Sequence, residues 1–134
     1  MEILDSSALI CFLKKEKGYG EIANLLRKSR QDKQSVFISQ LNFIEVVYFL
    51  LRTFGSTRTK EIVAQLKSPY LGIVNYMDAD LALYSATLKS TFSLSLGDAI
   101  GLAFTKIMNG KFWTKDKALV PVAEKEKIDL CLIK

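Results

Sequence analysis

Four acidic residues lie where the flanking sequence is apolar, and this pattern restricts the folds open to the chain. They are Asp5 after Ile3-Leu4, Glu45 within Phe43-Ile44-Glu45-Val46-Val47, Asp98 within Leu96-Gly97-Asp98-Ala99-Ile100, and Asp116 after Phe112-Trp113-Thr114-Lys115. An ionised carboxylate that leaves water needs a cation, a shared proton or hydrogen bonds. Four such acids in 134 residues predict a fold that gathers them around a common partner.

The residue types present limit what that partner can be. The chain has no histidine, which excludes zinc sites built on imidazole and acid/base catalysis by histidine. Carboxylate oxygens favour Mg²⁺ or Mn²⁺.

The two cysteines, Cys11 and Cys131, are far apart in sequence and have apolar neighbours. Their spacing is typical neither of a metal site nor of a disulfide framework, so we expect two buried thiols in a reducing compartment.

The charge balance bears on location and partners. The formal net charge is +5, and if several acids are buried the surface is more basic still, which favours a polyanionic partner. A solvated basic surface with no such partner is an equally good interpretation of charge alone. No apolar run approaches the roughly 18 residues of a membrane span, and no basic and apolar leader precedes the first strand. We expect a cytoplasmic protein.

Strand patterns alternate with helix patterns along the chain. Strands are predicted at residues 1–4, 36–38, 71–74, 111–114 and 128–133, and helices from residue 8, at 21–28, 39–52, 57–66, 78–88 and 95–108. Ser39 and Asp78 are expected helix caps, and Pro69 is expected to close the 57–66 helix. This alternation predicts an α/β fold, a three-layer α/β/α sandwich with a mostly parallel central sheet. Residues 1–134 are expected to form a single domain.

The predicted sheet suggests where the acids meet. Asp5 and Asp116 each follow a strand, and in parallel sheets the functional crevice lies outside the carboxyl ends of the strands. Glu45 and Asp98 lie early in two helices and can project to the same rim. Converging carboxylates repel one another, and a divalent cation removes this conflict. Mg²⁺ keeps several waters when bound, so such a site suits phosphodiester hydrolysis.

Each acid also has a plain structural interpretation. Asp5 and Asp98 are both suited to capping a helix, where a carboxylate accepts backbone N–H bonds. Glu45 is within reach of pairing with Arg52 on the same helix. Asp116 fits an ordinary turn, because Thr-x-Asp beside lysine often marks one.

In order, Leu4-Asp5-Ser6-Ser7, the mid-helix Glu45, Ser95-Leu96-Gly97-Asp98-Ala99 and Trp113-Thr114-Lys115-Asp116 resemble the PIN-domain ribonucleases, particularly the VapC toxins. The resemblance spans essentially the whole chain. It implies that Asp5, Glu45 and Asp98 are the central metal-binding and catalytic carboxylates, with Asp116 as a fourth. It also implies that the hydroxyls of Ser6, Ser7 and Thr114 support the acids or their waters. An endoribonuclease using Mg²⁺ (or Mn²⁺), a VapB antitoxin partner and a homodimer are further implications.

Other residues are candidates for holding RNA. The basic ones are Lys14, Lys15, Lys17, Arg27, Lys28, Arg30, Arg52, Arg58 and Lys60, and the aromatic ones are Tyr19, Tyr48, Tyr70, Tyr76 and Trp113. A solvated helix face accounts equally for the cations, and core packing for most of the aromatic residues. Two non-catalytic alternatives stay open, an RNA-binding module and a receiver-like signalling domain with an acidic metal pocket. Antitoxin contacts are expected on exposed apolar positions of the first two helices.

Overall fold

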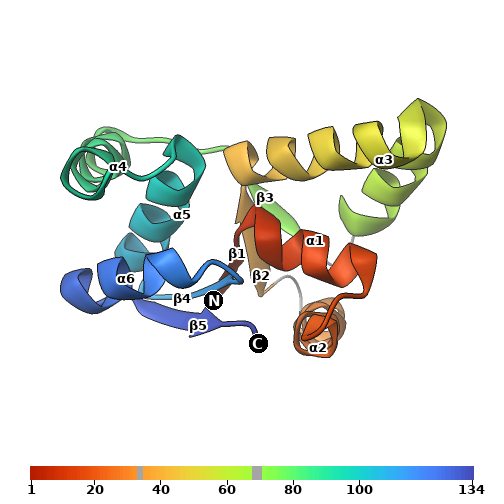
Figure 1. The fold of residues 1–134 in the computed structure, drawn as a ribbon, viewed down its shortest axis with the longest axis horizontal. Helices are drawn as coiled ribbons and strands as arrows, with labels where there is room; N and C mark the ends of the chain where they lie inside the picture. The colour runs from red at the N-terminus through yellow and green to blue at the C-terminus, as the bar shows by residue number, and fades with distance from the viewer. Residues whose placement is uncertain (33–34, 68–70) are drawn as a thin grey trace.

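A computed structural model describes residues 1–32, 35–67 and 71–134 (Figure 1). The strands are β1 (Glu2–Leu4), β2 (Val36–Ser39), β3 (Gly72–Val74), β4 (Lys111–Thr114) and β5 (Asp129–Leu132). The helices are α1 (Ser6–Lys14), α2 (Tyr19–Gln31), α3 (Gln40–Lys67), α4 (Ala79–Phe92), α5 (Leu96–Ile107), the 3₁₀ turn η1 (Lys117–Leu119) and α6 (Val120–Glu126). Pro69 and Tyr70 lie outside the described residues.

The five strands form one sheet in the order β3-β2-β1-β4-β5, and every strand pairing is parallel. This confirms the predicted parallel sheet. The order differs from the 2-1-3-4-5 order of flavodoxin-like and receiver folds, so the topology disfavours the receiver alternative. The chain progresses outward from β1 to β3 and then returns to the other side of β1 with β4. The strand order therefore reverses between β1 and β4, where crevices form in such sheets.

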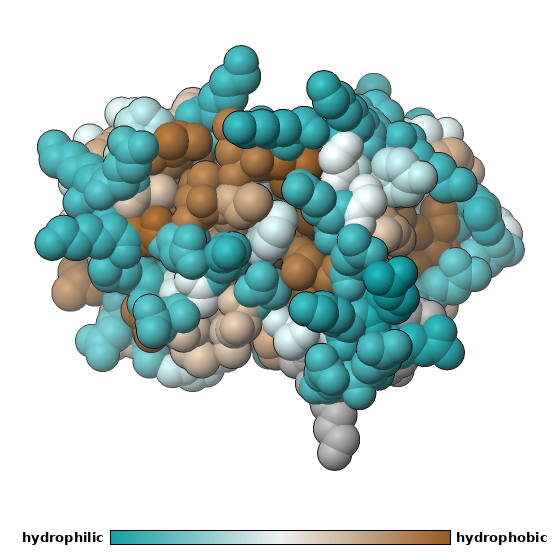
Figure 2. All heavy atoms as spheres, turned by 90° about the horizontal axis from the view of Figure 1, so that it is seen from below, coloured by the Kyte–Doolittle hydropathy of each residue, from teal (hydrophilic) through white to brown (hydrophobic). Residues whose placement is uncertain are grey.

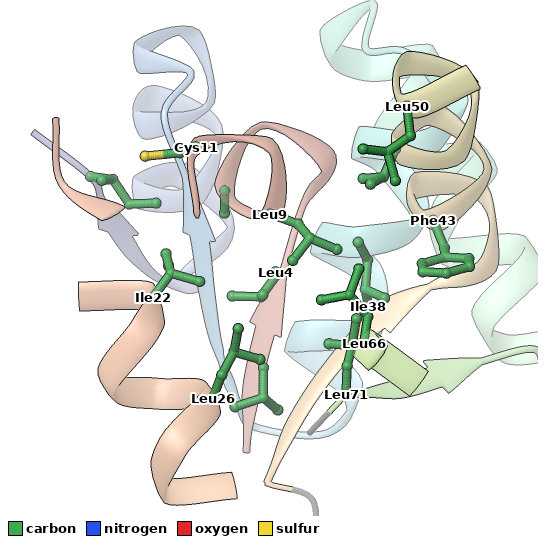
Figure 3. Close-up of a cluster of buried hydrophobic side chains, with 14 residues drawn as sticks. Leu4, Leu9, Cys11, Ile22, Leu26, Ile38, Phe43, Leu50, Leu66 and Leu71 are labelled. Atoms are coloured by element: carbon green, nitrogen blue, oxygen red, sulfur yellow. The ribbon is translucent and has the colours of Figure 1, made fainter. Parts of the chain in front are cut away.

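The two faces of the sheet carry separate cores. Neighbouring strand residues point to opposite faces, and Leu4 packs with residues of α1, α2 and α3, whereas Ile3 packs with residues of α4, α5 and α6. Figure 3 shows the first core, in which Leu4 lies between Leu9 of α1 and Leu26 of α2. The predicted three-layer sandwich is thus confirmed.

Helix α3 is divided at Gly55, where φ is 81° and ψ is 177°. A positive φ is readily adopted by glycine and strained for most other residues. The chain turns back there (Figure 1), so the two helices predicted for 39–52 and 57–66 are two arms of α3. Ser39 accepts a bond from the N–H of Asn42 (3.2 Å) and Asp78 one from Leu81 (2.8 Å), which confirms both predicted caps.

Some expectations about local structure are wrong. Helix α1 begins at Ser6 and not at residue 8, because Asp5, the single residue between β1 and this helix, caps it. Helix α6 was not predicted, because its seven residues are too few to show a helical repeat. Both thiols are free, and Cys11 is buried as expected, whereas Cys131 is only partly buried. Among the described helices, none has both the length and the apolar character that crossing a membrane requires.

Candidate active site

Asp5 occupies the point where the strand order reverses. It follows β1, is 2% exposed, and caps α1 through the N–H of Ala8, which donates to Oδ1 (2.9 Å). Two hydroxyls also donate to this carboxylate, Ser7 to Oδ1 (2.7 Å) and Thr114 to Oδ2. The predicted capping role is therefore confirmed, and it coexists with a position at the expected crevice.

The hydroxyls that hold Asp5 are themselves fixed by the backbone after β4. The N–H of Lys115 donates to Ser7 Oγ (2.9 Å), and the N–H of Asp116 donates to Thr114 Oγ1 (3.0 Å). Thr114 is fully buried. The carboxylate thus sits in a network that joins the ends of the two central strands, which fixes its orientation.

Asp98 and Glu45 approach each other at the start of α5. Ser95 caps this helix, accepting a bond from the N–H of Asp98 (3.1 Å), so the interpretation of Asp98 as the cap is wrong. Glu45 extends from α3 to the same turn, because a Cβ built on Gly97 would lie 2.8 Å from its Oε1. The absence of a side chain at Gly97 is what lets the Glu45 carboxylate lie against the N-terminal end of α5, where the helix dipole favours an anion.

Electrostatic interactions connect all four predicted acids. Burial raises the pKa of Asp5 from 3.8 to about 6, with a smaller contribution from Asp98. Partial desolvation raises the pKa of Glu45, again with repulsion from Asp98, although a hydrogen bond from Ser6 lowers it. The pKa of Asp98 is raised by burial and by Asp116, against a lowering from Ser95. Asp98 is therefore the acid that interacts with each of the other three.

The apolar neighbours in the sequence indicated buried acids, but two of the four are exposed. Asp5 is buried and Asp98 is half-buried, but Glu45 and Asp116 are exposed. Asp116 caps η1 through the N–H of Ala118 (2.9 Å), so its expected turn-forming role is also confirmed.

Glu45 has no salt bridge within the described part of the chain, and its suggested pairing with Arg52 is not formed. The Arg52 guanidinium instead donates to the hydroxyl of Tyr48 (3.1 Å). An unpaired carboxylate next to a second acid is available to bind a cation.

The side chains of this site offer the kind of ligand atom, oxygen, that divalent cations such as Mg²⁺ prefer. The carboxylates are hard oxygen ligands, their mutual repulsion favours a cation, and a buried amide oxygen of Asn42 beside Glu45 has no donor among the described residues. In residues 1–32, 35–67 and 71–134, however, no three acidic or cysteine side chains are placed to hold one ion together. The exposed side chains of Glu45 and Asp116 are the ones with rotamer freedom to complete such a site.

Asn42, Gly97 and Ser95 are close to the acids and were not among the predicted site residues. Asn42 is fully buried between α3 and α5. Its signal in the sequence is a polar residue three positions before Glu45, in an otherwise apolar stretch. One helical turn separates the two residues, which places them on neighbouring parts of the same helix face.

The basic residues named as candidates for RNA contact are all exposed. Figure 2 shows the molecule from below, where hydrophilic side chains surround hydrophobic atoms. The expectation that most of the aromatic residues pack in the core is wrong for Tyr19, Tyr48 and Tyr76, which are 42%, 60% and 59% exposed. Trp113 is half-buried, and its Nε1 donates to Glu2 Oε1 (3.2 Å).

Comparisons with known proteins agree with this geometry. Structures that resemble the chain include a toxin-antitoxin complex from Klebsiella pneumoniae (18% identity, TM-score 0.72, covering 100% of this chain and 98% of that one). They also include VapBC2 from Rickettsia felis bound to a promoter DNA fragment (14% identity, TM-score 0.73, 99% and 98% covered). A third is DNA-bound VapBC from Salmonella typhimurium (15% identity, TM-score 0.72, 99% and 98% covered).

These identities are low, so the structural likeness concerns the fold. No curated protein matches the sequence. The family comparison matches residues 3–125, nearly the whole chain, to the PIN domain. With its parallel sheet, its reversal of strand order at Asp5 and this family match, the chain belongs to the PIN domain family.

Proposed function

We propose that this chain is a metal-dependent endoribonuclease, the VapC-type toxin of a toxin-antitoxin pair, which hydrolyses RNA phosphodiester bonds. The observation that carries the proposal is the environment of Asp5. A buried carboxylate with a raised pKa lies at the crevice of the sheet and interacts with a second acid, Asp98. Such an arrangement opposes folding when the acids are ionised, and strongly perturbed acids of this kind cluster at functional sites.

Asp5, Glu45, Asp98 and Asp116 would hold Mg²⁺ or Mn²⁺. When bound, the ion would polarise the phosphate, lower the pKa of the attacking water and offset negative charge in the transition state. The protein's own groups orient the acids. Ser7 and Thr114 fix both oxygens of Asp5, because each donates to one of them.

A hydroxyl group also orients the Glu45 carboxylate. The Ser6 hydroxyl bonds its carboxylate and favours the ionised form, since this bond lowers the pKa of Glu45. The three hydroxyls implied by the resemblance thus each have a defined contact, through which they keep an acid ionised and oriented.

An exposed cation on the helix that carries Glu45 supports a polyanionic substrate. Arg52 lies on α3 with Glu45, and its guanidinium lies 5.7 Å from the ring of Tyr48. Because Tyr48 is 60% exposed, the pair offers a positive charge and an aromatic face to solvent. Phosphate contacts by arginine and base stacking on aromatic rings are the two common modes of single-stranded RNA binding.

Protein partners are the other part of the proposal. The similar structures include VapBC complexes, and we propose a VapB-type antitoxin, a homodimeric toxin and action in the cytoplasm. The first arm of α3 exposes the large apolar side chains Ile44, Tyr48, Leu51 and Phe54. Exposed apolar stripes of this kind mark protein interfaces. The expected contacts on the first two helices find less support, since Tyr19 is their single strongly exposed large apolar residue among those described.

An RNA cleavage assay tests the proposal. Purified protein, free of any antitoxin, is incubated with total cellular RNA and Mg²⁺ or Mn²⁺, with EDTA and with Asp98→Asn. Asp129→Asn is the matched control, because Asp129 is exposed and begins β5, at the opposite end of the sheet. We expect discrete cuts that EDTA and Asp98→Asn abolish and Asp129→Asn preserves. Cuts that survive in Asp98→Asn, or the absence of cuts with either metal, would contradict the proposal.

A further inference from the structure

A small hollow lies at the carboxyl ends of β2 and β3, on the edge of the sheet where Asp5 follows β1. Its volume is about 250 Å³. Gln40 directly follows β2, Asn75 directly follows β3, and both residues line the hollow. The register pairs Ser39 with Val74, so the two amide residues come next to each other at neighbouring strand ends. The functional crevice of a parallel sheet lies at this edge.

The hollow is close to the acids in two directions. Leu41 lines it and lies four residues before Glu45, so the two residues share one face of α3, about 6 Å apart along the helix axis. Across the sheet, β2 separates β1 from β3. Neighbouring strands are about 4.8 Å apart, which places Asn75 roughly 10 Å from Asp5 along the sheet edge. A group bound at the acids therefore has its immediate neighbour within reach of the hollow.

The walls of the hollow favour a neutral guest. Its floor is apolar, formed by Val74 of β3 and by Ile100 and Phe104 of α5. None of the described residues that line it is charged. A phosphate or carboxylate would leave water there without a cation to pair with, which is unfavourable. A flat uncharged group loses far less by the same transfer.

Two free amides lie at the rim. Gln40 and Asn75 are exposed, and neither side chain has a hydrogen-bond partner within the part of the chain that the structure describes. Each amide offers two N–H donors and one carbonyl acceptor. That combination matches the edge of a nucleobase, which presents donors and acceptors side by side.

An aromatic ring lies beside these amides. Tyr76 also lines the hollow and is 59% exposed. Its hydroxyl donates to the carboxylate of Asp78, which caps α4 through the N–H of Leu81 (2.8 Å). The ring is therefore tied to the start of a helix although it faces solvent. Unpaired bases of RNA are commonly bound by stacking on aromatic rings and by hydrogen bonds to their edges.

We propose that this hollow binds one unpaired nucleobase of the RNA substrate, beside the phosphate that is cleaved. Tyr76 stacks on the base, and the amides of Gln40 and Asn75 bond its edge. The inference rests on the nuclease proposed above and adds that its substrate is single-stranded next to the cut. A base inside a duplex is stacked and paired, so it presents neither a free face nor a free edge. The three side chains set specificity and do not touch the scissile bond.

Four substitutions separate the ring from the amides. Tyr76→Ala removes the ring, whereas Tyr76→Phe keeps it and removes only the bond to Asp78. Asn75→Ala removes one amide. Gln31→Ala is the matched control, because Gln31 is an exposed amide at the end of α2. That end lies at the opposite edge of the sheet, since Ser29 of α2 accepts the N–H of Val36 at the start of β2 (3.3 Å).

The probes are an RNA oligonucleotide that carries the wild-type cut site and copies with an abasic residue at each position beside the cut. We expect the loss of one of these bases to lower kcat/KM of wild type about 10-fold or more. Tyr76→Ala should cleave the intact oligonucleotide about as slowly as wild type cleaves the abasic copy, and should lose little more on that copy. Tyr76→Phe and Gln31→Ala should respond to the abasic residue as wild type does. Asn75→Ala should reduce the discrimination between bases at that position by about 10-fold.

An oligonucleotide with 2-aminopurine at the same position gives a readout that needs no cleavage. Stacking on an aromatic ring quenches the fluorescence of this base. In EDTA, we expect quenching on binding to wild type and to Tyr76→Phe, and none on binding to Tyr76→Ala.

The outcomes distinguish the two proposals. If wild type cleaves RNA but the abasic residue slows Tyr76→Ala as much as wild type, the role of the hollow is overturned and the nuclease stands. Slower cleavage of both oligonucleotides by the variants, together with a changed oligomeric state in light scattering, would assign the hollow to a contact between copies of the chain and would also overturn it. A wild-type protein that neither binds nor cleaves the RNA would overturn both proposals.

Discussion

Replacing Asp5 with asparagine is predicted to stabilise the protein while abolishing its activity. Asp5 is 2% exposed, and burial raises its pKa from 3.8 to about 6. An acid with a raised pKa in the folded state favours folding when protonated. The contribution is fully present below the unfolded pKa and is lost as the pH rises through the folded one. Near neutral pH the ionised Asp5 therefore opposes folding.

The magnitude follows from the pKa difference. A rise from 3.8 to about 6 corresponds to about 3 kcal/mol, since each pKa unit is worth 1.36 kcal/mol. Asparagine removes the buried charge and keeps an oxygen for Ala8 and Ser7. Its NH₂ group then faces Thr114, whose hydroxyl can turn to Ser7 Oγ, 3.4 Å away. Because this rearrangement weakens some bonds, we expect a net gain of about 1–3 kcal/mol near pH 7.

Urea unfolding of wild type and Asp5→Asn in EDTA, at several values between about pH 4 and pH 8, measures this difference. The gain should be present near pH 7 and should shrink toward pH 4, where wild-type Asp5 is protonated. Asp129→Asn, which removes an exposed carboxylate, should change stability by less than about 0.5 kcal/mol throughout. A variant less stable than wild type near pH 7, or a difference independent of pH, would refute the reasoning.

Three other predictions concern the same site. Gly97→Ala should lower kcat/KM for RNA by about 100-fold, because the added Cβ would displace the Glu45 carboxylate, and it should also lower stability in urea unfolding, because that Cβ would crowd the buried Asn42 amide; unaltered cleavage would count against it. Thr114→Val should cost about 1–3 kcal/mol in urea unfolding. It should also move the acidic limb of the pH–rate profile to higher pH, because the Thr114 hydroxyl lowers the pKa of Asp5 in the wild type and the variant lacks it. Mn²⁺ at 100 times its Kd should stabilise wild type by about 2.7 kcal/mol in thermal unfolding, and an equal gain in Asp98→Asn would contradict the assignment of that acid.

The fold was predictable where the pattern is local. Apolar residues of β1 and β2 identify buried strands, and Ser39 and Asp78 identify helix starts because capping needs one side chain and the next turn. Helix α6 was missed since its seven residues complete barely two turns. Its position depends on packing against η1 and β5, which the local sequence does not specify.

The candidate site was predictable only in part, for a related reason. Acids such as Asp5 and Asp98 stand out from apolar neighbours, and strand ends indicate a shared edge. The roles of Asn42 and Gly97 depend on the contact between α3 and α5, whose residues are more than fifty positions apart. Exposure was misjudged for Glu45 because an apolar sequence neighbour on a helix need not share its face.

The chemical ends of the RNA products test the central claim most directly. If water hydrolyses the phosphodiester at a cation held by Asp5, Glu45 and Asp98, every cut should leave a 5′-phosphate and a 3′-hydroxyl. No such product should form in EDTA or with Asp98→Asn. Products ending in a 2′,3′-cyclic phosphate would show that the RNA 2′-hydroxyl is the nucleophile and would contradict this account.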